Sequence, residues 1–276
     1  MKRHIVSRRF RRTGIALADL LVVAALIPLA CSLLIGCYRT RCTGSNRVQC
    51  SSNLRQIGQA LLIYSNDAKG PYPRSTYVPG ETVTPTWGTQ TEPNDVSAAL
   101  YLLLRTQDIT SEVFICPSSN AEPWDFGRAP RNVMSWSNWE GRDGVRKQLS
   151  YSYANPYPDD AAAKLGYKLN NSLGAEFAVA ADINPGTTGD AGQNVLAVTS
   201  TSNARDMKRG NSVNHDGDGQ NVLYGDGHVE FQTNPFCGVQ RDMIYARRAG
   251  ASGFASSAVV DSPYDANDSV LLPTDD

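Results

Sequence analysis

The chain has 276 residues, of which 41% are hydrophobic and 19% charged, an ordinary composition for one or two folded domains. Its formal net charge is −1, but residues 1–55 hold ten Lys or Arg and a single acid, Asp19, so the rest of the chain is acidic. No basic patch is interleaved with aromatic residues, which argues against a nucleic-acid partner.

The N-terminal segment predicts a membrane anchor. Residues 1–14 form a basic leader with six Lys or Arg, and the apolar run 15–37 follows with Asp19 as its only charge. At about 1.5 Å per residue, a helix of this length crosses a hydrocarbon core of about 30 Å. We therefore expect a transmembrane helix over 15–37 in the cell inner membrane, in contact with membrane lipids. The positive leader places the N-terminus in the cytoplasm and the head in the periplasm or at the cell surface.

An acid inside a membrane segment is costly and usually functional. The stretch "TGIALADLLVV" has Gly14 before an apolar Ile15, and Asp19 is the fifth residue counted from Ile15. This arrangement resembles the leader junction of type IV pilins and type II secretion pseudopilins. The resemblance implies cleavage after Gly14 by a prepilin peptidase, methylation at Ile15, and pairing of Asp19 with the new amine of this or a neighbouring subunit. Two alternatives stay open: an anchor without this cleavage, and lipidation of Cys37 in "LIGC".

Residues 38–70 are expected to extend the N-terminal helix, although "CTGSN" at 42–46 could divide it. One helical face is apolar, because hydrophobic residues recur at helical spacing: Val48, Leu54, Ile57, Leu61 and Tyr64. "KGPYP" at 69–73 ends this helix. We predict an α+β fold, in which a long N-terminal membrane-spanning helix packs on a small antiparallel-sheet, pilin-like head with loop insertions.

Three further blocks resemble a group of prepilin-type proteins of planctomycete-like bacteria. They are "CSSNLRQIGQALLIYSND" at 50–67, "VFICPSS" at 113–119, and a C-terminal pattern of His215 followed by Asp226-Gly227. In that family a His, nine residues and Asp-Gly form the signature, whereas ten residues separate His215 from Asp226 here. The resemblance implies that His215, Asp226 and Gly227 are signature residues of a C-terminal domain.

The head is expected over residues 71–245, outside the cytoplasm. Residues 95–109 predict a second helix, and "QNVLYGDGHVEF" at 220–231 predicts a hairpin whose Asp-Gly turn supplies positive φ. Other short strands are predicted at 113–116, 149–153, 177–181 and 194–199. A Trp-rich stretch at 120–148 is interpreted as an ordered insertion loop. The segment 246–276 is expected to be a flexible acidic tail.

Candidate ligands and cross-links are few. In "NHDGDGQN", Asp216 and Asp218 alternate with glycines, which allows a Ca²⁺ site but also a plain turn. His215 and His228 are an alternative transition-metal pair. Cys50 and Cys116 fall within two of the family-like blocks, so a disulfide between them would join helix to sheet; Cys37 and Cys42 are an alternative pair.

No nucleophile elbow, P-loop, zinc-protease or dinucleotide motif occurs, so we expect no enzymatic activity. The predicted function is that of a prepilin-type membrane-anchored structural protein, which would serve as a subunit of a pilus or type II secretion pseudopilus or as a surface protein. Its partners would be other pilin-like subunits, contacted through the N-terminal helix. The alternative is a membrane- or lipid-anchored extracytoplasmic binding module that uses the Trp-rich loop, and a metal hydrolase is a weaker one.

Overall fold

The computed structural model describes residues 17–79, 81, 93–123, 148–188, 192–250 and 256–275. The chain divides into two compact units, Met1–Gly44 and Ser45–Asp276. We call the second one the head unit; it contains the hydrophobic core formed by the described residues.

Helix α1 covers Leu17–Asp67 and runs without a break through residues 42–46. Within the described ranges, however, no helix is both long enough and apolar enough to cross a bilayer. Length alone is not sufficient, because a spanning helix also needs about 20 consecutive, mainly apolar residues. This finding contradicts the predicted transmembrane helix over 15–37. The predicted fold class with its membrane-spanning helix and the predicted single-pass inner-membrane location are corrected accordingly.

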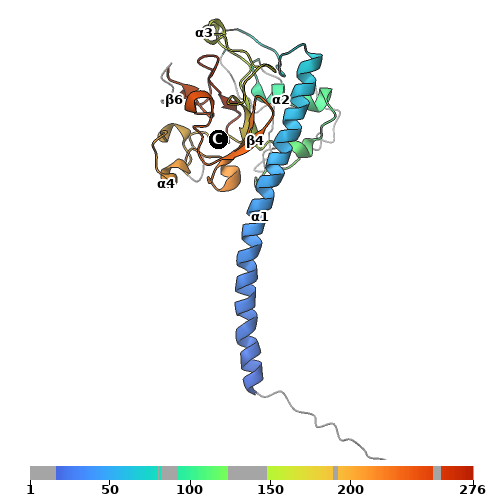
Figure 1. The fold of residues 1–276 in the computed structure, drawn as a ribbon, viewed down its shortest axis with the longest axis vertical. Helices are drawn as coiled ribbons and strands as arrows, with labels where there is room; N and C mark the ends of the chain where they lie inside the picture. Colours follow the sequence, from blue (N-terminus) through green and yellow to red (C-terminus); the bar gives the residue numbers. More distant parts are fainter. Residues whose placement is uncertain are drawn as a thin grey trace, which may run out of the picture. The chain divides into compact units, whose positions relative to one another are not determined.

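The head unit, whose elements are coloured along the sequence in Figure 1, is built on a five-stranded antiparallel sheet in the order β4-β3-β2-β1-β7. Its strands are β1 (Tyr151–Ala154), β2 (Ala178–Asp182), β3 (Gln220–Tyr224), β4 (Val229–Gln232) and β7 (Leu271–Leu272). In the register of the central pair, Tyr151 lies opposite Asp182. A separate two-stranded sheet joins β5 (Arg247–Arg248) and β6 (Ser256–Ala258). All five residues of β2 and of β3 are buried, so both faces of the central sheet are covered.

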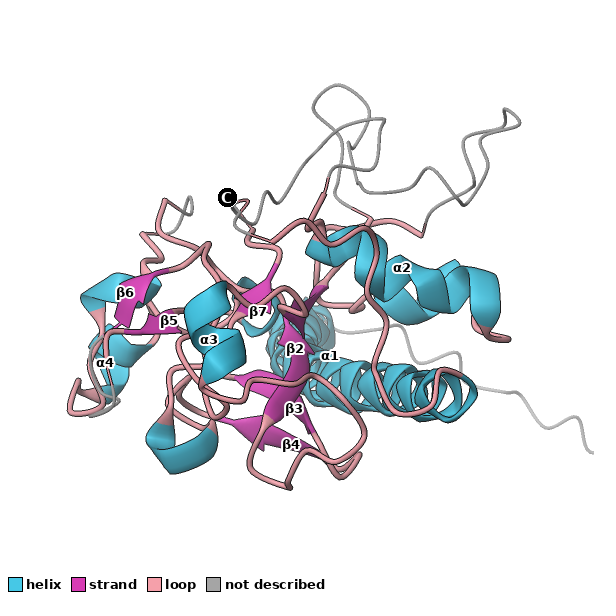
Figure 2. Ribbon diagram, turned by 90° about the horizontal axis from the view of Figure 1, so that it is seen from above, coloured by secondary structure: helices cyan, strands magenta, loops and turns pink. Residues whose placement is uncertain are grey.

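Three shorter helices complete the described part: α2 (Val96–Thr106), α3 (Asp160–Lys164) and α4 (Ala204–Met207). Helix α2 begins where the Asp95 carboxylate accepts a hydrogen bond from the Ala98 N–H at 2.9 Å, as an N-cap residue does. Its buried face and the part of α1 within the head unit lie on the same side of the sheet (Figure 2). The helix predicted over 95–109 is thus confirmed with a shorter range.

Helix α1 contacts the sheet closely in the head unit. Leu54, Ile57 and Leu61 are fully buried, as the sequence periodicity predicted. Gly58 lies on this face, and a Cβ atom there would come within 2.8 Å of Leu223 Cδ1. The absence of a side chain therefore allows the helix backbone to approach β3. Val48, assigned to the same apolar face, is instead 68% exposed.

The predicted hairpin is confirmed, since β3 pairs with β4 around a turn in which Gly227 has a φ of +88°. Two predicted strands are wrong. Residues 113–116 and 194–199 contain 3-10 turns, at Ser111–Phe114 and Val195–Ala197. Short runs of β-branched and apolar residues suit both a strand and a buried turn, so their composition did not distinguish the two. The Trp-rich loop falls mainly on residues 124–147, outside the described part.

The predicted flexible acidic tail is wrong for the described residues 256–275. Val270, Leu271 and Leu272 are fully buried, and β7 pairs with β1. The acids of this segment have buried partners: the Asp268 carboxylate accepts the Arg248 backbone N–H at 3.2 Å. High acidity predicted disorder because the sequence alone does not reveal such partners.

Candidate functional site

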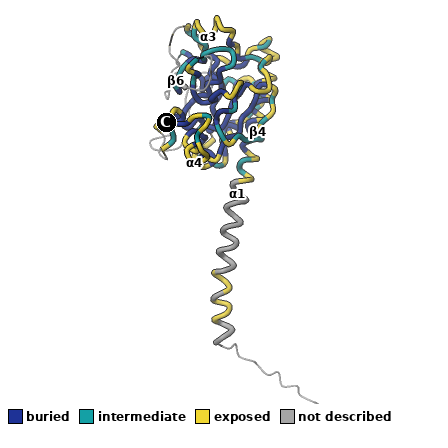
Figure 3. The backbone as a smooth tube through the Cα atoms, turned by 60° about the vertical axis from the view of Figure 1, so that its left-hand side comes forward, coloured by how far each residue is buried: buried dark blue, intermediate teal, exposed yellow. Residues whose placement is uncertain are grey.

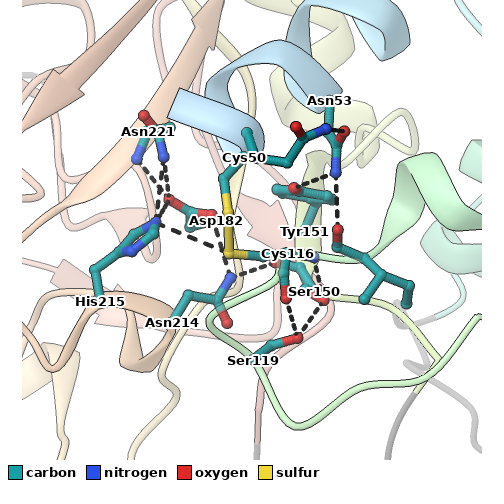
Figure 4. The surroundings of a disulfide bond; sticks show 12 residues. Cys50, Asn53, Cys116, Ser119, Ser150, Tyr151, Asp182, Asn214, His215 and Asn221 are labelled. Atoms are coloured by element: carbon teal, nitrogen blue, oxygen red, sulfur yellow. Dashed lines mark hydrogen bonds and ion pairs between the residues drawn. A yellow bond between two sulfur atoms is a disulfide. The ribbon is translucent and has the colours of Figure 1, made fainter. Parts of the chain in front are cut away.

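A buried cluster lies where α1 meets the sheet and the loop before β3 (Figure 4). Cys50 of α1 and Cys116, which follows the 3-10 turn at Ser111–Phe114, form a disulfide. Asp182 ends β2, and His215 ends a 3-10 turn at Val213–His215. All four residues are buried. The disulfide hypothesis is confirmed, but the bond links α1 to the loop after the 3-10 turn and not, as predicted, directly to a strand.

Hydrogen bonds hold both ends of the disulfide in place. The Cys116 N–H donates to Ser150 Oγ at 2.9 Å. One turn after Cys50, the Asn53 side chain donates to the Ile115 carbonyl at 2.8 Å and to the Tyr151 hydroxyl at 3.2 Å. The bond therefore lies within a polar network that joins α1, β1 and the Cys116 loop, as Figure 4 shows.

Asp182 is the most heavily hydrogen-bonded member of the cluster. Its Oδ2 accepts from the Asn221 backbone N–H at 2.6 Å and from Asn221 Nδ2 at 3.0 Å, and lies 3.1 Å from His215 Nε2. Its Oδ1 accepts from Asn214 Nδ2 at 3.2 Å. A buried carboxylate is tolerated only when donors replace the lost water, and these groups provide that replacement.

The His215 ring lies between Asp182 and the disulfide. Its Nε2 is 3.9 Å from Cys116 Sγ, and the imidazole and the Phe231 ring form a T-shaped pair with centroids 5.8 Å apart. Nδ1 is buried without a hydrogen-bond partner among the described residues. Nearby, burial first and the Asp182 charge second raise the pKa of Tyr151 and of Tyr245 well above the ordinary value. Both phenols therefore stay protonated, and the Tyr245 hydroxyl donates to the Asp182 carbonyl at 2.8 Å.

This arrangement joins four segments that are distant in sequence. Potential ligand atoms of Cys50, Cys116, Asp182 and His215 all lie within 4.8 Å of one another, so the group could hold a metal ion. As the residues stand, the two sulfur atoms are bonded to each other. In the oxidised form the cluster therefore acts as a covalent and hydrogen-bonded link between α1 and the sheet.

The predicted Ca²⁺ residues lie elsewhere. Asp216 is exposed with a φ of +56°, and Asp218 forms ion pairs with Arg47 at 3.1 Å and with Lys208. The Lys208 hydrogen bond is the main cause that lowers the pKa of Asp218. No third acidic or histidine ligand joins these two residues in a metal-like group among the described residues. Since both Asp218 oxygens face cations, the segment matches the turn interpretation better than the Ca²⁺ site.

The signature residues separate into two places. His215 belongs to the buried cluster, whereas Asp226 and Gly227 form the β3–β4 turn, in which Asp226 Oδ1 accepts the His228 backbone N–H at 3.0 Å. His228 stacks on Tyr224, with the ring centroids 4.5 Å apart. Among the described residues, the metal-like group contains His215 without His228, so the structure does not bring that predicted pair into one group.

Sequence reasoning missed Asp182, Asn214 and Asn221 as members of the cluster. One signal was present: Asp182 follows the apolar run "FAVAA", where a charge at the end of a buried strand needs partners. Gly14 and Ile15 lie outside the described residues, and the side chains of Asp19 and Cys37 are likewise not described.

No protein-family model matches the chain, and searches of curated proteins and of solved structures also gave no match.

Proposed function

We propose that this protein is a prepilin-type structural subunit, part of a pilus-like or type II secretion pseudopilus-like assembly. The N-terminal unit would pack against the same unit of like subunits, and the head unit would be the folded part that each subunit carries. One observation carries the proposal: α1 leaves a cluster of large apolar side chains uncovered in the N-terminal unit.

The exposed side chains are adjacent in sequence and large. Their exposed fractions run from 53% to 64%, for Leu21, Val22, Val23, Leu26 and Ile27. Figure 3 colours part of α1 outside the head unit as exposed. Successive residues of a helix are about 100° apart, so Leu21, Val22 and Val23 point in three different directions. A helix that is apolar on several sides is normally covered by other protein or by another apolar phase. Side-by-side contact with equivalent helices would cover these residues.

The sequence around Asp19 supports the same arrangement. A carboxyl group among apolar side chains needs a cationic partner, and cleavage between Gly14 and Ile15 would create one in the new amine. In an assembly, this pair would also fix how far one helix is shifted along its neighbour. The resemblance to pilin leader junctions points to a prepilin peptidase as the enzyme that acts on the chain.

The burial and hydrogen bonding of two polar residues in the head unit support a structural role. The acid and the imidazole that a hydrolytic site would use, Asp182 and His215, are both fully buried, and the acid is committed to four donor groups. A substrate would have to displace these hydrogen bonds. Their arrangement is better suited to holding three segments together.

Assembly can be tested with a matched pair of variants. Val22→Asp puts a charge among the exposed apolar residues, and Val48→Asp makes the same change at an exposed site of the same helix in the head unit. We expect the wild type and Val48→Asp to form large particles in sedimentation velocity and electron microscopy, and Val22→Asp to remain small. Equal behaviour of the two variants, or a wild type that never associates, would refute the proposal.

Processing gives a second test. N-terminal sequencing of the mature protein should start at Ile15, and Gly14→Val should leave the leader attached. A mature protein that starts at a lipidated Cys37 would exclude the prepilin assignment.

Ca²⁺ binding at Asp216 and Asp218 is a separate proposal. If Ca²⁺ binds there, EDTA should lower the melting temperature of the wild type but not that of Asp216→Asn/Asp218→Asn.

A further inference from the structure

We propose that the reduced head unit binds one Zn²⁺-type ion through Cys50, Cys116, Asp182 and His215. The disulfide and the metal would then be alternative cross-links at the same place. The oxidised chain would have a covalent bond there, and the reduced chain a metal centre. This inference does not depend on assembly through α1.

The spacing of the ligand atoms favours such a centre. Zn–S bonds of about 2.3 Å and Zn–N or Zn–O bonds of about 2.0–2.2 Å place neighbouring ligands about 3.3–3.8 Å apart in a tetrahedron. His215 Nε2 lies 3.1 Å from Asp182 Oδ2 and 3.9 Å from Cys116 Sγ, close to that range. The two sulfur atoms are too close, because they share a bond. Once this bond is cleaved, rotation of the two side chains can separate them.

The ligand set indicates which ion is preferred. Two thiolates, one imidazole and one carboxylate form a borderline-soft, four-coordinate set, which suits Zn²⁺ and not Ca²⁺ or Mg²⁺, since these prefer six or more oxygen ligands. With a neutral His215 the four ligands carry three negative charges, so Zn²⁺ would leave a net charge of −1. Without the ion, the reduced cluster would hold two thiols beside a buried carboxylate.

The surroundings already position one of the ligands, Asp182. Asn221 and Asn214 donate to the Asp182 carboxylate and fix its direction, as groups around metal-bound carboxylates do. His215 can bind a metal through Nε2 only as the tautomer with its proton on Nδ1. Nδ1 has no hydrogen-bond partner among the described residues, so this tautomer breaks no existing contact of Nδ1.

Exchange of the disulfide for the metal centre requires a reductant. Two molecules of a thiol transfer two electrons and two protons to the Cys50–Cys116 bond, giving two free thiols and the disulfide of the reductant. Zn²⁺ then binds as both thiols release their protons to solvent. In the reverse direction, a small-molecule disulfide takes two electrons from the thiolates and two protons from solvent and becomes two thiols, which re-forms the Cys50–Cys116 bond and releases the ion.

The test uses the full chain with Cys31, Cys37 and Cys42 replaced by Ser, which leaves Cys50, Cys116 and Cys237. After reduction with a phosphine and its removal without oxygen, Co²⁺ is titrated as a spectroscopic probe and then displaced by Zn²⁺. We expect one Co²⁺ per chain with thiolate-to-cobalt charge-transfer absorption, and no such absorption for the oxidised chain. Replacing Cys50 and Cys116 by Ser should abolish it, and replacing Cys237 by Ser should leave it unchanged.

A second measurement assigns the site directly. Zn²⁺ should slow alkylation of Cys50 and Cys116 at least tenfold in the reduced chain, as measured by mass spectrometry, while Cys237 reacts at the same rate with or without the ion. If reduction unfolds the head unit, Zn²⁺ should restore the near-ultraviolet circular dichroism of its buried tyrosines. The proposal fails if Co²⁺ gives no thiolate absorption, if the oxidised chain binds equally well, or if Zn²⁺ neither protects these thiols nor restores the fold.

Discussion

His215 Nε2 lies 3.1 Å from Asp182 Oδ2, and both side chains are fully buried. This pair ties the loop before β3 to the end of β2, next to the disulfide that fixes α1. Because the pair lies where three segments converge, its loss should affect the whole head unit and not one loop.

The first prediction concerns Asp182. Asp182→Ala should lower the free energy of unfolding by about 3–5 kcal/mol, because it leaves buried donors of Asn214, His215 and Asn221 without an acceptor. Asp218→Ala is the control, since Asp218 is half exposed and its ion pairs should contribute at most about 1 kcal/mol. Urea denaturation of the two variants measures the difference. Similar losses in both would mean that the buried network is not stabilising.

The second prediction concerns the disulfide, whose cysteines are 66 residues apart. Cys50→Ala/Cys116→Ala should lose about 2–4 kcal/mol, since the bond no longer restricts the unfolded chain. A reductant, with metal ions removed by EDTA, should cause a similar loss in the wild type and have no effect on the variant. Urea denaturation with and without reductant tests both statements. A variant that reductant still destabilises would show that another disulfide contributes.

The third prediction uses two glycines of α1. A side chain at Gly58 would meet Leu223 at 2.8 Å, whereas nothing lies within 4 Å of a Cβ at Gly44. Gly58→Val should therefore destabilise the head unit by about 1–3 kcal/mol through overpacking. Gly44→Val should change stability by less than about 0.5 kcal/mol, because Val and Gly differ little in helix propensity. Thermal melts of both variants give the comparison, and equal effects would contradict close contact between α1 and β3.

The fourth prediction concerns pH. Burial, followed by the Asp268 charge, raises the pKa of Asp242 to about 8, although the Ser269 N–H and Arg248 oppose the shift. Burial also raises the pKa of Asp268 to about 6, against the opposing effects of the Tyr264 and Arg248 N–H groups and the Arg248 charge. Unfolded Asp titrates near pH 3.9, so the folded state binds more protons between about pH 4 and 8.

The contribution of Asp242 and Asp268 to the free energy of unfolding should therefore be largest below about pH 4. It should decrease as pH rises through about 6 and then about 8. The Arg248 guanidinium lies 3.2 Å from Asp242 and 3.7 Å from Asp265. Urea denaturation at pH 5, 7 and 9 should show a smaller decrease for Asp242→Asn than for the wild type. An increase in stability with pH that is unchanged by the substitution would contradict the raised pKa values.

Local patterns predicted part of this structure well. The α1 face with Leu54, Ile57 and Leu61, helix α2 and the hairpin around Gly227 all follow from spacing and turn chemistry within short windows. The Cys50–Cys116 pairing came from a resemblance between sequence blocks, and the structure confirms it. The helix face, helix α2 and the hairpin need no knowledge of distant contacts.

Features that depend on distant partners were missed or wrong. The buried strand at Leu271–Leu272 is stabilised by β1, so its acidic neighbours predicted a flexible tail instead. Asp182 belongs to the buried cluster because the fold brings Asn214, His215 and Asn221 within hydrogen-bonding distance of its carboxylate. Its place in the sequence does not reveal these partners. The membrane span was inferred from apolar character and helix length, and no described helix meets both requirements. Sequence spacing gave no information on which charges would find buried partners.

The two edges of the head sheet differ in how they discourage unwanted pairing. Strand β7 is only two residues long and is followed by Pro273, which has no N–H to offer. Strand β4 is four residues long and carries the exposed Glu230. Short, charged or proline-flanked edges resist addition of a further strand. A subunit proposed to associate through its helix can then be concentrated without its sheets joining edge to edge, which keeps ordered association separate from aggregation.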